Sequence, residues 1–309
     1  MISKTSVLRS FTTGALHLTL LAPPLHAQTG SPSPKPAGPT TGSVLAAATA
    51  ADWRPLDPEN TLYLELATGR VVIELTPAFA PNHAANVKAL VREGYFDGLT
   101  INRVQDNYVA QWGDANEGPA KRAIKQAKAT LPGEFDRAMS SDIPFTPSPD
   151  ADVYAAETGW SMGFPAARDP KSGRTWLTHC YGVLGTARGN DPASGGGTQL
   201  FVVIGHSPRH LDRNYTAFGR VVKGIEGLST LPRGTGPLGF YEKPEQRVVI
   251  KSMRVAADVP AAERTSVQVL RTDTPTFTSL VSARRTRSEE SFQYKVSRIE
   301  VCNVPIPTK

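Results

Sequence analysis

The chain has 309 residues, of which 39% are hydrophobic and 20% charged, and its formal net charge at pH 7 is +6. This composition excludes a disordered or collagen-like chain, and the length allows one large domain with extensions. Lysine and arginine are scattered among acidic residues and form no basic stripe, so we expect no nucleic-acid partner.

Residues 1–27 have the pattern of a secretory signal peptide. Lys4 and Arg9 form a basic start, a short apolar stretch follows, and the small residue Ala27 precedes the expected cleavage point. The apolar stretch is shorter than the ~20 residues that a membrane-spanning helix needs, and no later segment is long enough. We therefore expect an exported, periplasmic protein whose mature chain is monomeric and does not span the membrane.

Proline, glycine and serine dominate the start of the mature chain, which predicts a linker over residues 28–57. The main domain is expected over 58–257. It begins with a hairpin of two β-rich runs over 61–75, and a helix is expected at 81–93, between Pro81 and Gly94. Five further β-type runs predict a mainly β domain, an antiparallel barrel or sandwich; they cover 108–111, 182–186, 199–204, 215–222 and 247–254.

Two regions fall outside this pattern. Residues about 115–179 are long and mixed in composition, which predicts a loop insertion. Residues 258–309 form a C-terminal extension with a helix beginning after Thr274 and a strand over 298–304. The extension is too short for a core of its own, so we expect it to pack on the barrel.

The chain has two cysteines, Cys180 and Cys302. A structural zinc site usually takes four closely spaced cysteine or histidine ligands, so no metal site is expected. An exported protein could join the two cysteines in a disulfide, or both could be separate buried thiols, and the sequence leaves the two alternatives open.

Three motifs in order along the chain carry a family resemblance. They are GYFDGLTINRVQDNYVAQWGD at 94–114, TQLFVVI at 198–204 and LDRNYTAFGRV at 211–221. Together they resemble the cyclophilin family, whose signature joins a Tyr-Asp-Gly turn to a strand that carries arginine, an aromatic residue and glutamine. The resemblance covers about 61–255 and implies a closed antiparallel β-barrel capped by helices.

The resemblance also implies an activity, peptidyl-prolyl cis/trans isomerisation of proline-containing polypeptides during the folding of exported proteins, without a cofactor. Arg103 matches the catalytic arginine and Gln111 the glutamine that orients it. A permanently charged guanidinium can stabilise a twisted prolyl amide by donating to it. The positions that match the substrate-binding residues are Tyr108, Val109, Ala187, Arg188, Gln199, Phe201, Leu211 and Tyr215.

The sequence departs from the family pattern at several positions around the site. Where the family usually has histidine, phenylalanine, methionine and glycine, this chain has Asn102, Tyr108, Val109 and Trp112, respectively. Tyr215 replaces a pocket histidine. Arg209 and His210 stand near the position of the tryptophan with which the family contacts cyclosporin-type inhibitors.

The sequence leaves two alternative functions to compare with the isomerase. One is a catalytically weak module that binds proline-containing segments; the pairing of Arg103 with Gln111 argues against it, because a simple binder has no use for an oriented guanidinium. The other is a serine hydrolase, but no serine has the Gly-x-Ser-x-Gly context and no histidine stands in a sequence typical of a base. The serines in question are Ser161, Ser194 and Ser207, and the histidines are His206 and His210.

Overall fold

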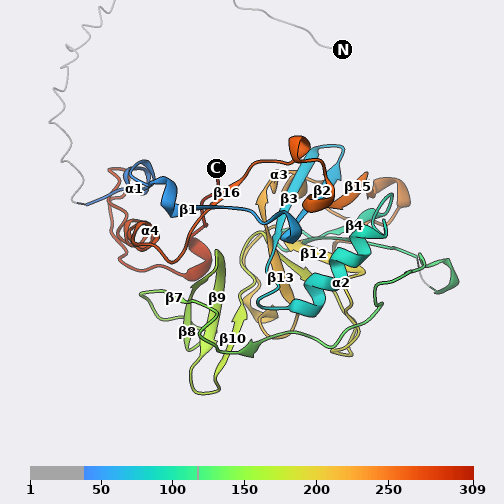
Figure 1. Ribbon diagram of the computed structural model, residues 1–309, viewed down its shortest axis with the longest axis horizontal. Helices are drawn as coiled ribbons and strands as arrows, with labels where there is room; N and C mark the ends of the chain where they lie inside the picture. Colours follow the sequence, from blue (N-terminus) through green and yellow to red (C-terminus); the bar gives the residue numbers. More distant parts are fainter. Residues whose placement is uncertain (1–37, 117) are drawn as a thin grey trace, which may run out of the picture. The chain divides into compact units, whose positions relative to one another are not determined.

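The computed structural model describes residues 38–116 and 118–309, so the predicted signal peptide and the first part of the predicted linker lie outside the described residues. Figure 1 shows the arrangement. The α-helices are α1 (Thr41–Ala46), α2 (Pro81–Arg92), α3 (Glu226–Ser229) and α4 (Pro275–Thr286). The strands are β1 (Trp53–Pro55), β2 (Thr61–Leu66), β3 (Gly69–Leu75), β4 (Thr100–Val104), β5 (Val109–Gly113), β6 (Arg137–Ala138), β7 (Thr146–Pro147), β8 (Glu157–Ser161), β9 (Phe164–Asp169), β10 (Arg174–Leu177), β11 (Val183–Thr186), β12 (Gln199–Val203), β13 (Ala217–Lys223), β14 (Val248–Val249), β15 (Ser252–Val255) and β16 (Gln268–Leu270).

The main domain is built on a curled antiparallel sheet of nine strands, in the order β14-β4-β5-β12-β11-β13-β3-β2-β15. The mainly β architecture is therefore confirmed. The expected closed barrel is wrong in one respect, because the two edge strands β14 and β15 are not paired with each other and the sheet forms roughly a half-barrel. The chain passes from one edge to the other at Ile250 and Lys251, whose N–H groups bond to opposite edges of the sheet, at Leu99 and Glu65.

Helix α2 covers this sheet and confirms the predicted helix. Pro81 occupies its first turn, where a missing N–H costs nothing. Gly94 follows its end with φ +72°, a left-handed conformation that glycine adopts without a Cβ clash. Val87, Leu90 and Val91 lie on one face of the helix and join the core inside the curled sheet. That core buries side chains from β2, β3, β4, β5, β12 and β13.

The predicted loop insertion is folded over much of its length. Residues 137–177 contain a second antiparallel sheet, of five strands in the order β6-β10-β9-β8-β7. The sequence prediction missed it because two of these strands have only two residues, and because Pro147 and Pro165 lie within strands. Burial of Trp160 and Phe164 against other parts of the chain stabilises the sheet.

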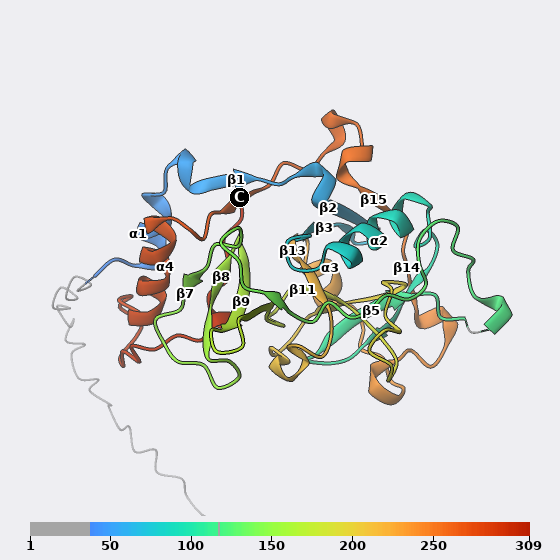
Figure 2. The same ribbon diagram turned by 60° about the horizontal axis from the view of Figure 1, so that its bottom comes forward.

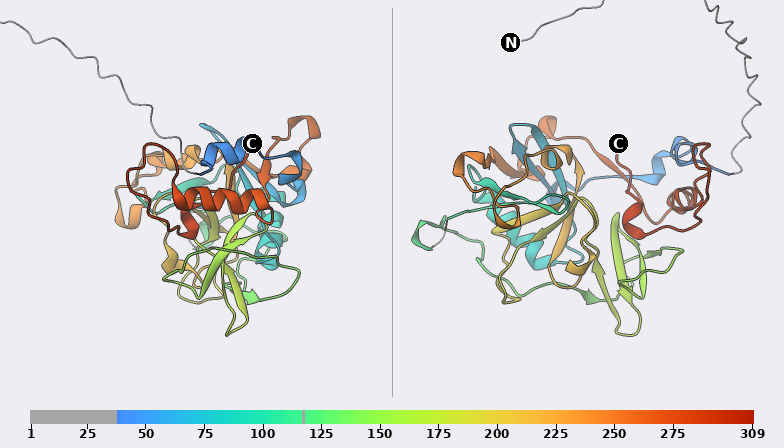
Figure 3. Two further views of the ribbon diagram at one scale, coloured as in Figure 1. Left: turned by 90° about the vertical axis from the view of Figure 1, so that its left-hand side faces the viewer. Right: turned by 180° about the vertical axis from the view of Figure 1, so that it is seen from behind.

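The segment before the main domain and the C-terminal extension fold together with this second sheet (Figures 2 and 3). Strand β1 pairs with β16, and α1 packs beside α4. The predicted linker over 28–57 therefore includes ordered structure from Thr41 onward. Helix α4 follows its cap Thr274 as predicted, whereas the strand expected over 298–304 is wrong, because this segment contains only a short 3₁₀ turn at Val301–Asn303.

The extension, the second sheet and one face of the main domain share a second hydrophobic core. Phe277 and Leu280 of α4 are fully buried in it, together with Trp160 of β8 and with Tyr63 and Val72 of the main sheet. Cys180 and Cys302 are joined by a disulfide with their Cα atoms 5.0 Å apart, which ties the extension to the main domain. The extension thus contributes to a shared core.

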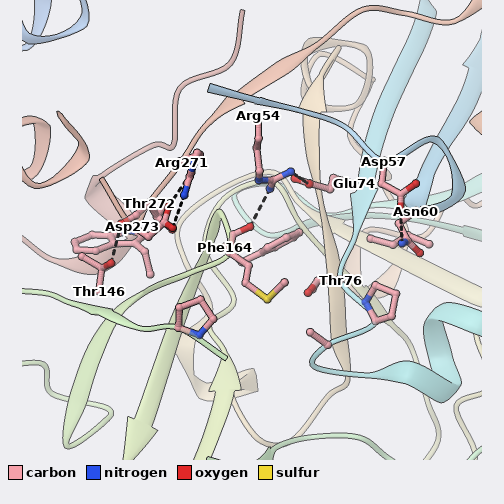
Figure 4. Close-up of a pocket in the computed structure, with 16 residues that line it drawn as sticks. Arg54, Asp57, Asn60, Glu74, Thr76, Thr146, Phe164, Arg271, Thr272 and Asp273 are labelled. Atoms are coloured by element: carbon pink, nitrogen blue, oxygen red, sulfur yellow. Dashed lines mark hydrogen bonds and ion pairs between the residues drawn. The ribbon is translucent and has the colours of Figure 1, made fainter. Parts of the chain in front are cut away.

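A cavity of about 410 Å³ lies where the main sheet meets the second sheet (Figure 4). Arg54 spans this junction: its Nη1 pairs with Oε1 of Glu74 on β3 at 2.5 Å, and its Nη2 donates to the carbonyl of Met162 at 2.9 Å. None of the substrate-binding or catalytic residues expected from the sequence lines this cavity. No helix in the described part of the chain has the length and apolar character to cross a membrane.

Candidate functional site

The candidate site is a row of directly paired residues across neighbouring strands of the main sheet. Phe201 on β12 pairs with Gln111 on β5, and Gln111 pairs with Arg103 on β4. Directly opposed residues of antiparallel strands place their side chains on the same face of the sheet. The sheet therefore brings together an aromatic ring, an amide and a guanidinium that lie up to 98 residues apart in the sequence.

Hydrogen bonds orient the guanidinium of Arg103. Its Nη1 donates to Oε1 of Gln111 at 3.0 Å, its Nε donates to the carbonyl of Leu238 at 2.7 Å, and its Nη2 donates to Oε1 of Gln105. A guanidinium has five N–H donors, so one N–H on each of Nη1 and Nη2 has no partner in the described part of the chain. These two donors can be offered to a ligand.

Burial shapes the electrostatics of this group. It lowers the pKa of Arg103, an effect opposed by Tyr108 and Tyr215, and it also raises the pKa of Tyr108. An arginine nevertheless stays protonated, because a guanidinium is not deprotonated in proteins. The site therefore presents a fixed positive charge in partly desolvated surroundings, where its interactions are stronger than in water.

An apolar cluster lies next to the guanidinium. Val109, Phe201 and Leu211 are buried and pack together, and Tyr108 and Tyr215 pack on them from half-buried positions. The Phe201 ring lies over Gly185, where an added Cβ would come within 2.6 Å of it. The cluster therefore needs a glycine on β11, and it has the apolar character that a proline ring would bind.

The three remaining expected residues lie around the same cluster. Ala187 packs on it directly. Gln199 accepts from Nε2 of Gln111 at 3.4 Å, and the guanidinium of Arg188 lies over the Tyr215 ring with its carbon 4.7 Å from the ring centre. The structure thus places all ten expected catalytic and substrate-binding residues in one region, while their roles stay predictions.

Of the departures from the family pattern, Trp112 and Arg209 are buried away from the site, whereas His210 lies at the site. Trp112 points into the core of the main domain and is fully buried, away from Gln111. Arg209 also turns inward: it is 4% exposed and pairs with Asp152 of the insertion and with Asp212. His210 remains at the site, where its ring stacks on Tyr108 with the two ring centres 6.2 Å apart.

Sequence reasoning missed a support beneath the apolar cluster. His179 is fully buried and stacks on Phe201, with ring centres 6.1 Å apart. Its Nδ1 lies 3.0 Å from Oδ1 of Asp212, which also accepts from the His179 backbone N–H. The same carboxylate group pairs with Arg209, so the network holds the floor of the cluster to the 3₁₀ turn that carries Leu211.

The sequence also gave no sign of two groups beside Arg103. Leu238 accepts from its Nε, and the Phe240 ring centre lies 5.4 Å from its guanidinium carbon. Both belong to the segment GPLGFY at 236–241, some 135 residues after Arg103. A glycine-rich turn followed by an aromatic residue was the available signal, but it carries no information on what the turn contacts.

No group of three or more histidine, cysteine, aspartate or glutamate side chains in residues 38–116 and 118–309 is arranged to hold a metal ion.

Comparison with known proteins places these residues within one family. Residues 61–255 match the family "Cyclophilin type peptidyl-prolyl cis-trans isomerase/CLD", the same range as the resemblance in the sequence. The chain is 31% identical over 179 residues to a "Probable peptidyl-prolyl cis-trans isomerase" of Brucella suis, covering 58% of this chain and 74% of the relative. It is 27% identical over 202 residues to "Peptidyl-prolyl cis-trans isomerase CYP23" of Arabidopsis thaliana, covering 61% and 71%.

Among solved structures, the chain is similar to the crystal structure of cyclophilin AquaCyp293 from Hirschia baltica. The TM-score is 0.67 at 30% sequence identity, and the match covers 87% of this chain and 97% of that one. The matched share of the chain is larger than residues 61–255, so the match extends beyond this range into the flanking segments.

Proposed function

Because the chain belongs to the family of cyclophilin-type peptidyl-prolyl cis-trans isomerases, we propose that it catalyses cis/trans isomerisation of prolyl bonds in polypeptides. The observation that carries this proposal is the guanidinium of Arg103, oriented by Gln111 beside the apolar cluster and left with one N–H on each terminal nitrogen. The named relatives support the same activity.

The geometry accounts for how such a site would act. Rotation about a prolyl bond has a barrier of about 20 kcal/mol because amide resonance is lost on twisting. In the proposed complex the proline ring packs on Phe201 and Leu211, and Arg103 donates to the amide nitrogen or carbonyl oxygen of the twisted bond. The guanidinium is already oriented and partly desolvated, so the twisted state is stabilised more than the planar one. No proton is transferred and no covalent bond is made.

We further propose that the substrates are exported polypeptides and that the protein works in the periplasm. The sequence of residues 1–27 supports export, and the disulfide between Cys180 and Cys302 is compatible with an oxidising compartment.

The test is turnover of a prolyl peptide by purified residues 28–309, measured by NMR exchange, for the wild type and Arg103→Ala. We expect the variant to lose at least ~2 kcal/mol of transition-state stabilisation with a smaller change in peptide affinity. Arg103→Lys should also be poor, because an ammonium lacks the planar fork of donors. Arg298→Ala, which changes an exposed arginine of the C-terminal extension, is the matched control.

Equal turnover by wild type and Arg103→Ala would overturn the mechanism. Peptide binding by a wild type that does not accelerate exchange would instead identify the protein as a binding module for proline-containing segments.

A further inference from the structure

The row of paired residues that forms the site continues past Arg103 to an aromatic side chain that has no assigned role. Arg103 on β4 pairs with Gln111 on one side, and on its other side its backbone forms an isolated antiparallel bridge with Phe240. The full row is Phe201, Gln111, Arg103 and Phe240. Neighbouring strands are about 4.8 Å apart, so Phe240 lies one strand beyond the guanidinium, on the side away from the apolar cluster.

Phe240 and Tyr108 flank the guanidinium of Arg103, with ring centres 5.4 Å and 5.6 Å from its carbon. Tyr108 belongs to the cluster that is expected to bind the proline ring. Within residues 38–116 and 118–309, Phe240 belongs to none of the hydrophobic clusters. It is 39% exposed, and Leu238 of the same loop is 67% exposed. Two large apolar side chains are thus exposed to solvent directly beside the charged group that would meet the substrate.

Single exposed apolar residues are common and need no explanation. Leu238 differs because its backbone is left-handed, with φ 56° and ψ 18°, a conformation that costs a non-glycine residue energy. Its carbonyl accepts from Nε of Arg103 in this conformation. The strained backbone is therefore used to hold the catalytic group, and the same turn leaves the leucine side chain in solvent.

The 234–241 loop is held rigidly against the strands that carry the site. Gly239, with φ +79°, lies so close to Gln105 that an added Cβ would be 2.5 Å from its Cα. Backbone bonds join Gly234 to Val104 and Tyr241 to Asn102, at 2.9 and 3.0 Å. A side chain presented by a rigid element binds without a large ordering cost.

We propose that Phe240 and Leu238 form an apolar subsite for the side chain of the residue that follows the substrate proline. The direction in which the substrate chain crosses the site follows from the order of the groups across the sheet. The family resemblance implies that Ala187, Arg188 and Gln199 line the groove for the residues before proline, and Ala187 and Gln199 lie on the Phe201 side of Arg103. A chain that continues past the guanidinium therefore reaches Phe240. The favoured substrates are proline followed by a large apolar or aromatic residue.

This subsite rests on the proposed isomerase function, and the experiment separates the two. Peptides Ala-Ala-Pro-Phe, Ala-Ala-Pro-Leu and Ala-Ala-Pro-Ala are compared by NMR exchange for turnover and by titration for affinity. Wild type, Phe240→Ala and Leu238→Gly are measured; glycine suits the left-handed backbone at 238 and removes only the side chain. Val249→Ala is the control, since it shortens another exposed apolar residue, on β14.

For the wild type we expect kcat/KM to be roughly five- to tenfold higher with phenylalanine than with alanine after proline, as burial of an apolar side chain implies. Phe240→Ala should remove most of this preference, because its turnover should fall much more on the phenylalanine peptide than on the alanine peptide. Leu238→Gly should reduce the preference for phenylalanine over alanine in part, and Val249→Ala should keep this preference.

Two results would overturn the subsite: a wild type with no preference, or a Phe240→Ala variant that loses activity equally on all three peptides, which would show that the ring only positions Arg103. If the wild type turns over none of the peptides, the isomerase proposal fails. The subsite is then tested by peptide affinity alone, with the same comparison of the three peptides and the same variants.

Discussion

Arg103 and Gln111 face each other across β4 and β5, and Nη1 of the arginine donates to Oε1 of the glutamine at 3.0 Å. The amide of Gln111 is in turn 3.4 Å from Gln199 on the next strand, β12. The amide thus fixes one end of a planar group that would otherwise rotate about its flexible side chain. The orientation of the guanidinium therefore depends on the neighbouring strands of the sheet as well as on the arginine itself.

Replacing Gln111 by leucine should lower turnover by acting through Arg103. We expect kcat to fall about tenfold, since one hydrogen bond to a charged group is lost, with KM little changed. Exchange kinetics over a range of peptide concentrations separate the two constants. Gln126→Leu, at an exposed position of the insertion, is the control. A rise in KM at constant kcat would show that Gln111 contacts the substrate and does not position the arginine.

Phe201→Ala should weaken both peptide binding and turnover, because the ring forms the floor of the apolar cluster. Truncation of a buried phenylalanine also costs about 3–5 kcal/mol of folding stability, so activity is measured where circular dichroism shows the variant folded. Phe218→Ala removes an equally buried ring from the main core, outside the cluster, and should be destabilised yet active. Full activity in a folded Phe201→Ala variant would make Phe201 a core residue only.

Cyclosporin-type inhibitors should bind this protein weakly even if it is an efficient isomerase. Arg209 is buried in its pairs with Asp152 and Asp212, which leaves the exposed His210, stacked on Tyr108, next to the site. The family resemblance implies that an indole N–H at this place donates to a carbonyl of the inhibitor. The smaller imidazole offers less apolar area, and loss of the hydrogen bond made by the indole would cost roughly 1–3 kcal/mol. Inhibition should therefore need concentrations orders of magnitude above the enzyme concentration.

The same experiment has a gain-of-function arm. His210→Trp should raise inhibitor affinity at least tenfold, because the substitution restores the apolar area and the N–H donor of an indole. His206→Trp, at another exposed histidine of the same region, should not. Tight, stoichiometric inhibition of the wild type would contradict the placement of His210.

Glu134 should make the attachment of the insertion sensitive to acid. Its carboxylate accepts from the backbone N–H of Asn82 and of His83 at the start of α2, and lies 2.6 Å from Nδ1 of His83. Burial alone would raise the pKa of Glu134, but the hydrogen bonds from His83 and Asn82 outweigh it and lower the pKa. The folded protein therefore binds this proton less readily than the unfolded chain does.

The sign of the effect follows from linkage. The stabilisation is complete above the unfolded pKa of about 4.3 and is lost as the pH falls through the lower folded pKa. Glu134→Gln should cost about 1–3 kcal/mol at pH 7, and the difference from wild type should shrink below about pH 4. Urea unfolding at several pH values measures this, with Glu290→Gln, at an exposed position, as the control. A pH-independent difference would refute the ionic role.

The sequence alone determined the elements whose patterns are local. The β2–β3 hairpin has two β-rich runs around a glycine turn, and α2 lies between a proline and a glycine, so both were predictable from neighbouring residues. The ordered motifs around Arg103, Phe201 and Leu211 also identified the family, because their spacing reflects one arrangement of strands.

Only the tertiary structure decided how distant segments combine. Strand β1 has three residues and pairs with β16 more than 200 residues later, and the five-stranded sheet contains strands of two residues. Segments this short are stabilised by burial against other parts of the chain, in this case the core around Trp160 and Phe277, and a local pattern cannot report that burial. The contact of Phe240 with Arg103 has the same origin, since a backbone bridge between a turn and a strand leaves no trace in either sequence.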